Sequence, residues 1–313
     1  MNKNKMIVTG GAGFIGSNLV DALVEKGFEV HAIDDLSNGI KENVNRKAIL
    51  HITDITNLKK IKPIFKDAKY VFHLAALPRV QFSIEHPIES HDANVNGTLN
   101  VLTASVEAKV KRVIYSASSS AYGDQKRLPL MEYMTPNPKS PYGLQKYVGE
   151  LLCKTWSEIY KLETVSLRYF NVYGPRHRSE GAYALVIVKF MEQSYNDEPM
   201  TITGDGKQTR DFTNVKDVVQ ANLLAMTSKK VGKGEVINIG AGRNQSVNRI
   251  AKLISGEVRY IPARLEPKNT LADNRLAKKL LGWKPTIKIE DGIEELKMIK
   301  EHEFGQKLAK LLK

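Results

Sequence analysis

The sequence has very few of the residues that mark disulfide-rich, metal-binding or membrane proteins. It contains 1 cysteine among 313 residues, Cys153, which cannot form an intrachain disulfide, and no cysteine and histidine cluster has metal-ligand spacing. No hydrophobic run approaches the ~18 residues that a membrane-spanning helix needs. We therefore expect a cytoplasmic protein with no metal site and no membrane segment.

The sequence also lacks the marks of a disordered or nucleic-acid-binding chain. Hydrophobic residues make up 42% and charged residues 26%, which is typical of globular proteins. A net charge of +13 would favour polyanionic partners, but the basic residues are scattered over predicted helices and aromatic residues are only 7%. Solvated helix faces therefore explain this charge better than a nucleic-acid partner. The N-terminus leads directly into a strand pattern, without the apolar segment of a signal peptide.

Short β-branched segments alternate with helical patterns from the N-terminus onward. The predicted strands are residues 6–9, 29–34, 48–52, 70–75, 112–118 and 164–170. This alternation predicts crossover connections and a parallel α/β sheet. After residue 171 the pattern breaks, and the later strands 201–204, 235–240 and 257–262 are expected in a smaller α/β part. For the basic C-terminal segment, a docked terminal helix is favoured over a membrane-surface role.

A glycine-rich segment, TGGAGFIGSNL, follows the first strand. Gly10, Gly13 and Gly16 stand at G-x-x-G-x-x-G spacing, and a helical pattern begins near Phe14. Without Cβ atoms the loop can approach a pyrophosphate, whose charge then faces the helix N-terminus. The small residues of HLAAL, 73–77, indicate either another close approach to a ligand or a buried strand end. The loop predicts dinucleotide binding.

Acidic residues follow the second and third strands. Asp34 and Asp35 lie about 20 residues beyond the glycine loop, where a carboxylate accepts hydrogen bonds from adenosine ribose and repels a 2′-phosphate. This position favours NAD over NADP, the alternative being a glycine turn with a surface Asp. Asp54 and Ile55 lie at the same edge of the sheet and could meet the adenine. Asp54 is equally suited to cap a helix that starts near Asn57.

The segment SPYGLQK carries the most specific pattern in the chain. Ser140 can cap a helix and Pro141 suits its first turn, so Tyr142 and Lys146 fall at i and i+4 on one face. An ammonium one turn away favours the phenolate, and we expect it to lower the pKa of the tyrosine. Ser118, at the end of the preceding strand, can hydrogen-bond the same oxygen. A base that removes a hydroxyl proton during hydride transfer requires this chemistry.

The sequence resembles the extended short-chain dehydrogenases/reductases and, among them, the UDP-glucose 4-epimerases and UDP-N-acetylglucosamine 4-epimerases. The matching segments are VTGGAGFIGSNLV, IDDLSNG, DIT, HLAA, NVNGT, YSASSSAYGD, SPYGLQK, LRYFNVYGPR, GDGKQTRDFTNVKDV and NTLADNRLAKKLLGWKPT. They span about residues 6–290. The resemblance implies a Rossmann domain with bound NAD over residues 1–171 and a nucleotide-sugar domain over 172–313, with some chain crossing between them. It also implies a homodimer formed by helices near 96–108 and 142–160.

The resemblance assigns roles to individual residues. Tyr142 resembles the catalytic base, Lys146 its partner and nicotinamide-ribose contact, and Ser118 the hydroxyl that handles the sugar proton. The cofactor contacts implied are Gly10, Gly13, Phe14, Ile15, Gly16, Asp34, Asp35, Asn38, Gly39, Asp54, Ile55, Leu74, Ala75, Ala76, Asn94, Tyr142, Lys146 and Phe170. The UDP-hexose contacts implied are Ser118, Ser119, Tyr142, Asn171, Arg210, Arg264 and Thr270.

Two arginines resemble a clamp on the UDP diphosphate. The guanidinium groups of Arg210 and Arg264 suit this charge because they bind it bidentately. A salt bridge with the neighbouring Asp211 is the alternative for Arg210. The chain departs from many relatives at Glu266 and Pro267, where those relatives have Arg-x-Gly-Asp, and this departure leaves the loop shape and ribose contact open.

The segment 118–123, SSSAYG, bears on the reaction. Related dehydratases resemble T-D-E-x-Y-G here and the decarboxylases also carry the Glu, because elimination needs an additional acid or base. No carboxylate stands at Ser118, Ser119 or Ser120, so we expect oxidation and re-reduction at C4, which is epimerisation. A reductase or dehydratase of another nucleotide sugar is the runner-up. A non-catalytic NAD-sensing protein is disfavoured by the set of Ser118, Tyr142 and Lys146.

Thr270 bears on substrate breadth. By resemblance, its position lines the hexose pocket, where a bulky Tyr accompanies enzymes restricted to glucose and small residues accompany tolerance of a 2-acetamido group. We therefore expect the chain to accept N-acetylated sugars as well, unless the pocket closes elsewhere, for example at Glu266 and Pro267.

Overall fold

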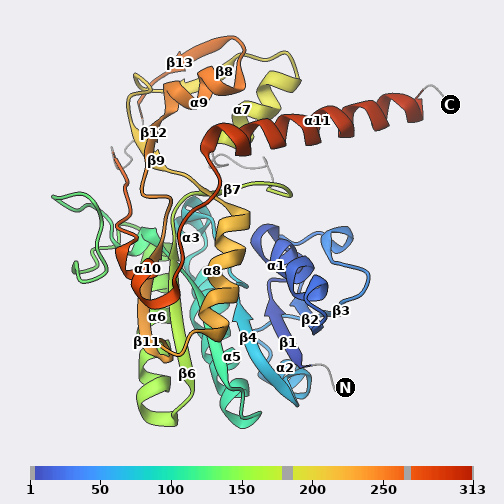
Figure 1. The fold of residues 1–313 in the computed structure, drawn as a ribbon, viewed down its shortest axis with the longest axis vertical. Helices are drawn as coiled ribbons and strands as arrows, with labels where there is room; N and C mark the ends of the chain where they lie inside the picture. The colour runs from blue at the N-terminus through green and yellow to red at the C-terminus, as the bar shows by residue number, and fades with distance from the viewer. Residues whose placement is uncertain (1–3, 178–185, 264–268, 312–313) are drawn as a thin grey trace.

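Seven parallel strands form the central sheet of the computed structural model, which describes residues 4–177, 186–263 and 269–311 (Figure 1). The strands are β1 (Lys5–Thr9), β2 (Glu29–Asp34), β3 (Ile49–Ile52), β4 (Ala68–His73), β5 (Arg112–Ser118), β6 (Glu163–Tyr169) and β11 (Lys233–Ile239). Their order is β11-β6-β5-β4-β1-β2-β3. This doubly wound order is that of a Rossmann sheet and confirms the predicted fold class.

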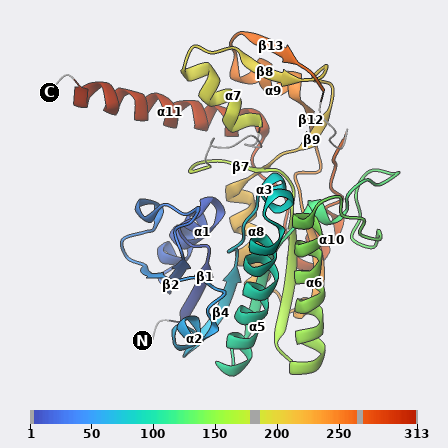
Figure 2. The same cartoon turned by 180° about the vertical axis from the view of Figure 1, so that it is seen from behind.

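Helices cover both faces of this sheet (Figures 1 and 2). One face carries α1 (Phe14–Glu25), α8 (Val215–Thr227) and α10 (Arg275–Leu281), and the other carries α2 (Leu58–Ile61), α5 (Gly97–Glu107) and α6 (Pro141–Tyr160). Successive strand residues point to opposite faces. In β1, Met6 and Val8 pack in the first cluster, whereas Ile7 packs in the second. Strands buried on both faces explain the continuous hydrophobic runs of the sequence.

Strand β11 corrects one expectation from the sequence. Residues 235–240 were expected in the smaller part, but β11 pairs in parallel with β6 and forms the edge of the central sheet. The crossover helix α8 returns the chain to this sheet, and Ile237 and Ile239 are fully buried in its core. At this edge the backbone of β11 forms hydrogen bonds with β6, and its apolar side chains are buried under the crossover helix.

The smaller part lies beyond the carboxyl ends of the central strands (Figure 1). It contains α7 (Val186–Tyr195), β8 (Met200–Thr203), β9 (Thr209–Asp211), β12 (Asn244–Ser246), α9 (Val247–Ile254), β13 (Val258–Ile261) and α11 (Ile289–Leu311). Its own core includes Phe190, Ile202 and Ile250. Ile293 and Leu296 dock the first turns of α11 on this core, and the helix then runs away from the body. Among the residues described, no helix is long and apolar enough to cross a membrane.

Short elements complete the junction between the two parts. They are α3 (Val80–Glu85), α4 (Pro87–His91), β7 (Val172–Tyr173) and β10 (Thr213–Asn214). β7 and β10 pair in parallel directly after the chain leaves β6. The junction therefore places residues 171–176 beside the ends of the central strands.

Candidate active site

A cleft with a volume of ≈ 2380 Å³ runs along the carboxyl ends of the central strands, below the smaller part. Sites for one drug-sized ligand usually have volumes of about 300–1,000 Å³, so this cleft has room for two. The residues expected from the sequence that line it are Gly10, Gly13, Phe14, Ile15, Gly16, Asp34, Asp35, Asn38, Gly39, Asp54, Ile55, Leu74, Ala75, Ala76, Ser118, Ser119, Tyr142, Lys146, Asn171, Arg210 and Thr270.

The glycine loop forms a backbone cradle at one end of the cleft. Gly10 has φ of +71°, and a Cβ on it would lie 2.7 Å from the Ala75 backbone nitrogen. A Cβ on Gly16 would lie 1.9 Å from the Gly10 carbonyl oxygen. Gly13 caps α1 without a side-chain acceptor, so the first N–H groups of this helix are not satisfied by a cap side chain. Such a cradle fits the pyrophosphate of a dinucleotide.

Asp34 joins this cradle to the end of β2. Its carboxylate accepts hydrogen bonds from the backbone N–H groups of Ala12 and Leu36, both at 2.9 Å. Burial raises the pKa of Asp34, and these backbone donors oppose the rise. Asp35 is more exposed and accepts from Ser37 N–H at 2.9 Å. Both carboxylates line the cleft where the sequence placed a ribose contact.

The end of β3 excludes one of the two roles considered for Asp54. The helix α2 is capped by Asn57, whose side chain accepts from Lys60 N–H. The Asp54 carboxylate accepts from Thr56 N–H at 2.8 Å, and Asp54 lines the cleft with Ile55. Asp54 is therefore not the helix cap, and its carboxylate faces the same edge of the sheet as Asp34.

Two expected cofactor contacts do not line the cleft. Asn94 is buried and holds the loop after β4, because its side chain accepts from Leu77 N–H (2.8 Å) and donates to the Leu77 carbonyl (3.1 Å). Phe170 is fully buried against Tyr122. Its neighbour Tyr169 lines the cleft instead, because successive residues of an extended strand point to opposite sides.

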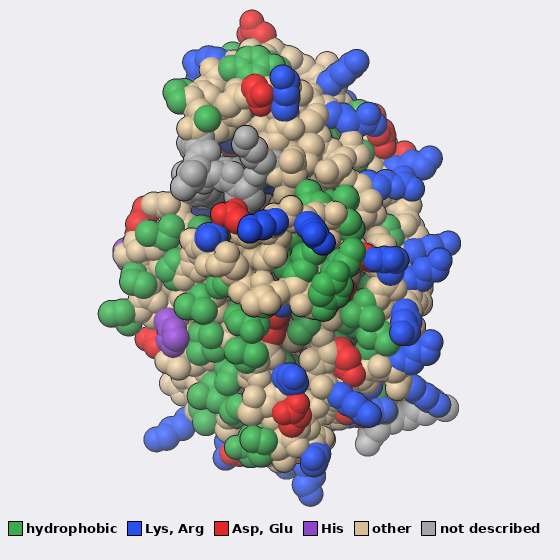
Figure 3. Space-filling model, turned by 90° about the vertical axis from the view of Figure 1, so that its left-hand side faces the viewer, with side chains coloured by type: hydrophobic (Ala, Val, Ile, Leu, Met, Phe, Trp, Pro, Cys, Tyr) green, Lys and Arg blue, Asp and Glu red, His purple; other side chains and the backbone are tan. Residues whose placement is uncertain are grey.

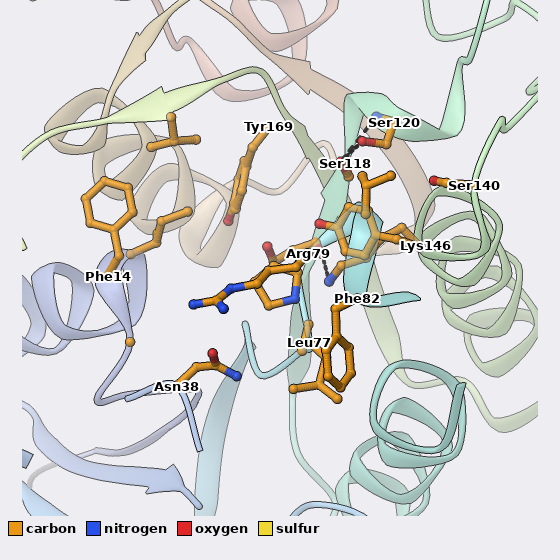
Figure 4. Close-up of a pocket in the computed structure, with 18 of the residues that line it drawn as sticks. Phe14, Asn38, Leu77, Arg79, Phe82, Ser118, Ser120, Ser140, Lys146 and Tyr169 are labelled. Carbon is orange, nitrogen blue, oxygen red and sulfur yellow. Dashed lines mark hydrogen bonds between the residues drawn. The ribbon is translucent and has the colours of Figure 1, made fainter. Parts of the chain in front are cut away.

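Ser118 and Tyr142 meet at the end of β5. Ser140 accepts from Gly143 N–H at 3.1 Å and Pro141 occupies the first turn of α6, so the predicted helix start is confirmed. The Tyr142 backbone N–H donates to the Ser83 hydroxyl at 3.1 Å, which fixes this turn against α3. The Ser118 hydroxyl donates to the Ser120 hydroxyl at 3.1 Å. Figure 4 shows Ser118, Ser120 and Lys146 around one end of the cleft.

The Lys146 ammonium is buried beneath this end of the cleft. It donates to the Ser116 carbonyl at 2.8 Å and lies 5.0 Å from the centre of the Tyr115 ring. Burial lowers the pKa of Lys146 to about 8, whereas the Glu150 carboxylate acts to raise it. Lys146 therefore carries its charge at neutral pH and loses it under mildly alkaline conditions.

The expected depression of the Tyr142 pKa is wrong for this structure. Burial raises the pKa of the Tyr142 hydroxyl above its ordinary value because the phenolate loses hydration, and a hydrogen bond with Ser118 opposes the rise. The Lys146 ammonium is directed to the Ser116 carbonyl instead of the tyrosine oxygen. Helical spacing placed the two residues on one face but did not determine where the ammonium points.

The other end of the cleft is built by the smaller part. The Thr270 hydroxyl accepts from Asp211 N–H (3.2 Å) and from the Asn171 amide (3.3 Å), which joins three segments at the wall. Arg210 lines the cleft from β9. The carboxylate of Asp211 instead accepts from the backbone of Gly242 and Ala272, so it does not serve as the ion-pair partner considered for Arg210. Arg264, Glu266 and Pro267 lie outside the described residues.

Several lining residues were not found by sequence reasoning. Arg79 precedes α3, and its side chain points into the cleft toward the side that carries Phe14 and Asn38 (Figure 4). Its backbone carbonyl accepts from Ser83 N–H at 3.0 Å, whereas its side chain has no hydrogen bond or ion pair with any residue in the described ranges. Phe82 also lines the cleft. The only signal for Arg79 was its position two residues after HLAAL, in the loop that follows a buried strand.

Comparison with known proteins identifies the family to which this chain belongs and several similar proteins. The model of the NAD dependent epimerase/dehydratase family matches residues 6–240. The structure of a UDP-glucose 4-epimerase from Thermotoga maritima with UDP-glucose is 39% identical, covers 97% of this chain and 99% of that chain, and has a TM-score of 0.90. A UDP-N-acetylglucosamine 4-epimerase from Methanobrevibacter ruminantium, solved with UDP-N-acetylmuramic acid, is 36% identical with coverages of 96% and 100% and a TM-score of 0.90. A UDP-N-acetyl-alpha-D-glucosaminuronate decarboxylase from Bacillus cytotoxicus is 33% identical over 94% of this chain and 96% of its own length.

Proposed function

Because the chain belongs to the NAD dependent epimerase/dehydratase family, we propose that it inverts C4 of the hexose of a UDP-sugar through a transient 4-keto sugar. The observation that carries this proposal is the convergence of Ser118, Tyr142 and Lys146 at one end of a cleft whose other features include a dinucleotide cradle. A structure of this family that was solved with UDP-glucose shares the fold over nearly the whole chain.

The glycine loop would hold the pyrophosphate of NAD with backbone N–H groups, and Asp34 and Asp35 would hold its adenosine ribose. Bound NAD would supply the hydride chemistry at the sugar carbon. Tyr142 takes the proton of the C4 hydroxyl and gives it back after the keto sugar has turned. The hydrogen bond between Tyr142 and Ser118 opposes the rise of the Tyr142 pKa, and the Lys146 ammonium supplies positive charge one helical turn away.

Epimerisation is supported over elimination by residues 118–120. A decarboxylase is among the relatives of the chain, so family membership alone leaves the reaction open. The three serines of this segment provide hydroxyl groups and no carboxylate beside Tyr142. Asp124, which also lines the cleft, is 66% exposed at its side chain and pairs with Lys139 at 3.9 Å. It is a solvated charge and lacks the burial that tunes an acid for elimination.

The smaller part supplies the UDP-hexose contacts in this proposal. Arg210 binds the diphosphate together with Arg264, and Asn171 and Thr270 face the hexose. Thr270 is small and is held by its own hydroxyl contacts, so the wall leaves space for a 2-acetamido group. We therefore include both UDP-glucose/UDP-galactose and the N-acetylated pair among the substrates.

A homodimer is also part of this proposal. The helices α5 and α6 lie side by side on one face of the sheet (Figure 2). Their exposed apolar side chains include Leu99, Leu144 and Leu151, and Ile84 and Ile88 add to them from α3 and α4. Figure 3 shows hydrophobic side chains gathered on the side of the molecule that carries α6, with Lys and Arg along the opposite edge. A second copy packed on α5 and α6 would bury this surface.

Product analysis tests the proposed function. Purified protein is incubated separately with UDP-galactose, UDP-N-acetylgalactosamine and UDP-glucuronate, without added cofactor, and the products are identified by NMR. We expect the C4 epimer of the first two sugars. Loss of water or CO2 from any of the three, or recovery of all three unchanged, contradicts the proposal.

A further inference from the structure

A buried ion pair lies behind the reactive end of the cleft. Glu150 of α6 and Arg168 of β6 form two hydrogen bonds, from Arg168 Nε to Oε1 at 2.8 Å and from Nη2 to Oε2 at 2.6 Å. Their side chains are 2% and 3% exposed. Neither residue lines the cleft, and the mechanism above uses neither of them. Two buried charges are costly unless they are paired with good geometry, so the position of this pair calls for an explanation.

The guanidinium of Arg168 is fixed from its far side. It lies 4.4 Å from the centre of the Tyr122 ring, whose hydroxyl donates to the Asn238 side chain at 2.7 Å. The Asn238 backbone N–H in turn donates to Glu132 at 2.9 Å. Arg168 therefore cannot turn away from Glu150 without breaking a packed arrangement. Because arginine stays protonated and binds both oxygens, it holds Glu150 as a carboxylate in one position.

Glu150 lies one helical turn beyond Lys146 on the same buried face of α6. The titratable groups that interact with the Lys146 ammonium are Glu150 and Cys153 from α6, Tyr115 from β5 and His73 from β4. Tyr142 lies one turn before Lys146 on α6, and Arg168 of β6 binds Glu150. His73 is neutral because burial lowers its pKa to about 3, and burial raises the pKa of the Cys153 thiol to about 12. Burial raises the pKa of Glu150, and the hydrogen bonds and charge of Arg168 oppose this rise. Glu150, held by Arg168 through both oxygens, is therefore the source of negative charge in this set.

We propose that Glu150, held by Arg168, is a positioning residue that keeps the buried Lys146 ammonium charged beside Tyr142. The Glu150 carboxylate thus stabilises the ammonium from behind the cleft, as hydration would stabilise it at the surface. The contribution of this charge to turnover rests on the proposed function, whereas its effect on the protonation of Lys146 does not. A merely structural pair joining α6 to β6 would affect stability and leave the titration of Lys146 unchanged.

Three variants separate these possibilities. Glu150→Gln removes the carboxylate charge and keeps the shape. The double variant Glu150→Met, Arg168→Met replaces the whole pair by apolar side chains. Proteins often keep their stability when a buried ion pair is replaced in this way, so the double variant can be measured if Glu150→Gln does not fold. Glu163→Gln is the matched control, because Glu163 pairs with Arg112 at 2.6 Å from the start of the same strand β6. It breaks an Arg–Glu pair of the same chemistry away from Lys146, in which Arg112 is 5% exposed and Glu163 is 40% exposed at the side chain.

The direct readout is the protonation of the Lys146 amine in protein labelled with 15N-lysine, followed by NMR against pH and assigned with Lys146→Arg. We expect the midpoint to fall by about 1 pH unit or more in Glu150→Gln, to fall by less in the double variant because the positive charge of Arg168 is removed as well, and to stay in place in Glu163→Gln. A folded Glu150→Gln or double variant that titrates like the wild type overturns the proposal. A shift of equal size in Glu163→Gln also overturns it.

The second readout is the alkaline limb of kcat for a substrate that the product analysis identifies. If Lys146 must be charged, this limb should move to lower pH by the same amount as the NMR midpoint, with KM for the UDP-sugar little changed. A shifted midpoint with an unshifted limb refutes the catalytic part. If the protein epimerises none of the sugars, the proposed function fails, and the NMR titration still decides the charge relation between Glu150 and Lys146.

Discussion

Replacing Thr270 by Tyr should make the enzyme discriminate against N-acetylated sugars. Thr270 lines the cleft, and its hydroxyl accepts from Asp211 N–H at 3.2 Å and from the Asn171 amide at 3.3 Å. A tyrosine ring at this wall takes the volume that an acetamido group would need. Overpacking typically costs 1–3 kcal/mol, which corresponds to a loss of about 5- to 150-fold in kcat/KM for the acetylated sugar.

The same substitution also removes the threonine hydroxyl, so a second variant is required. Thr270→Val keeps the volume and loses the two hydrogen bonds, which contribute about 0.5–1.5 kcal/mol each to stability. It should lower the free energy of unfolding and affect both sugars alike. The quantity to measure is the ratio of kcat/KM for UDP-galactose to that for UDP-N-acetylgalactosamine. An unchanged ratio in Thr270→Tyr, or an equal change in Thr270→Val, would refute the reasoning.

Three further predictions follow from the cleft. Tyr142→Phe should lower kcat by about 10²- to 10⁴-fold with little change in the Kd for the UDP-sugar by calorimetry, and wild-type turnover would remove Tyr142 from its role. Gly16→Ala should yield protein without retained NAD, because its Cβ would lie 1.9 Å from the Gly10 carbonyl oxygen. Chromatography of the nucleotide released on denaturation measures the retained NAD. Full retention would contradict the assignment of the glycine loop as the pyrophosphate site. Wild-type protein should release NAD or NADH in the same assay because of Asp34, and release of NADP would contradict that assignment.

The sequence predicted those parts of the fold that depend on local pattern. The alternation of strands and helices predicted the parallel sheet, and Ser140 with Pro141 predicted the start of α6. The partner of a strand is not a local property: residues 235–240 have the same apolar alternation whether they pair with β6 or in the smaller part. The structure determines this pairing through the crossover helix α8, which no single segment encodes.

The sequence predicted which segments line the cleft, but not always which side chain faces it or which hydrogen bonds that side chain forms. Tyr169 and Phe170 are neighbours, and only the phase of the strand decides that Tyr169 faces the cleft. The spacing of Tyr142 and Lys146 predicted a shared helix face, but the Ser116 carbonyl that receives the ammonium belongs to another strand. Such tertiary hydrogen bonds, together with burial, set the pKa values of the site.

The central claim is that hydride leaves and returns to the same sugar carbon within one cleft. UDP-galactose that carries deuterium at C4 tests it directly when it is incubated with the purified protein in ordinary water. The account predicts UDP-glucose that keeps the deuterium at C4, because the label travels as hydride and never equilibrates with solvent. UDP-glucose with hydrogen from water at C4, or no inversion at this carbon, would contradict it.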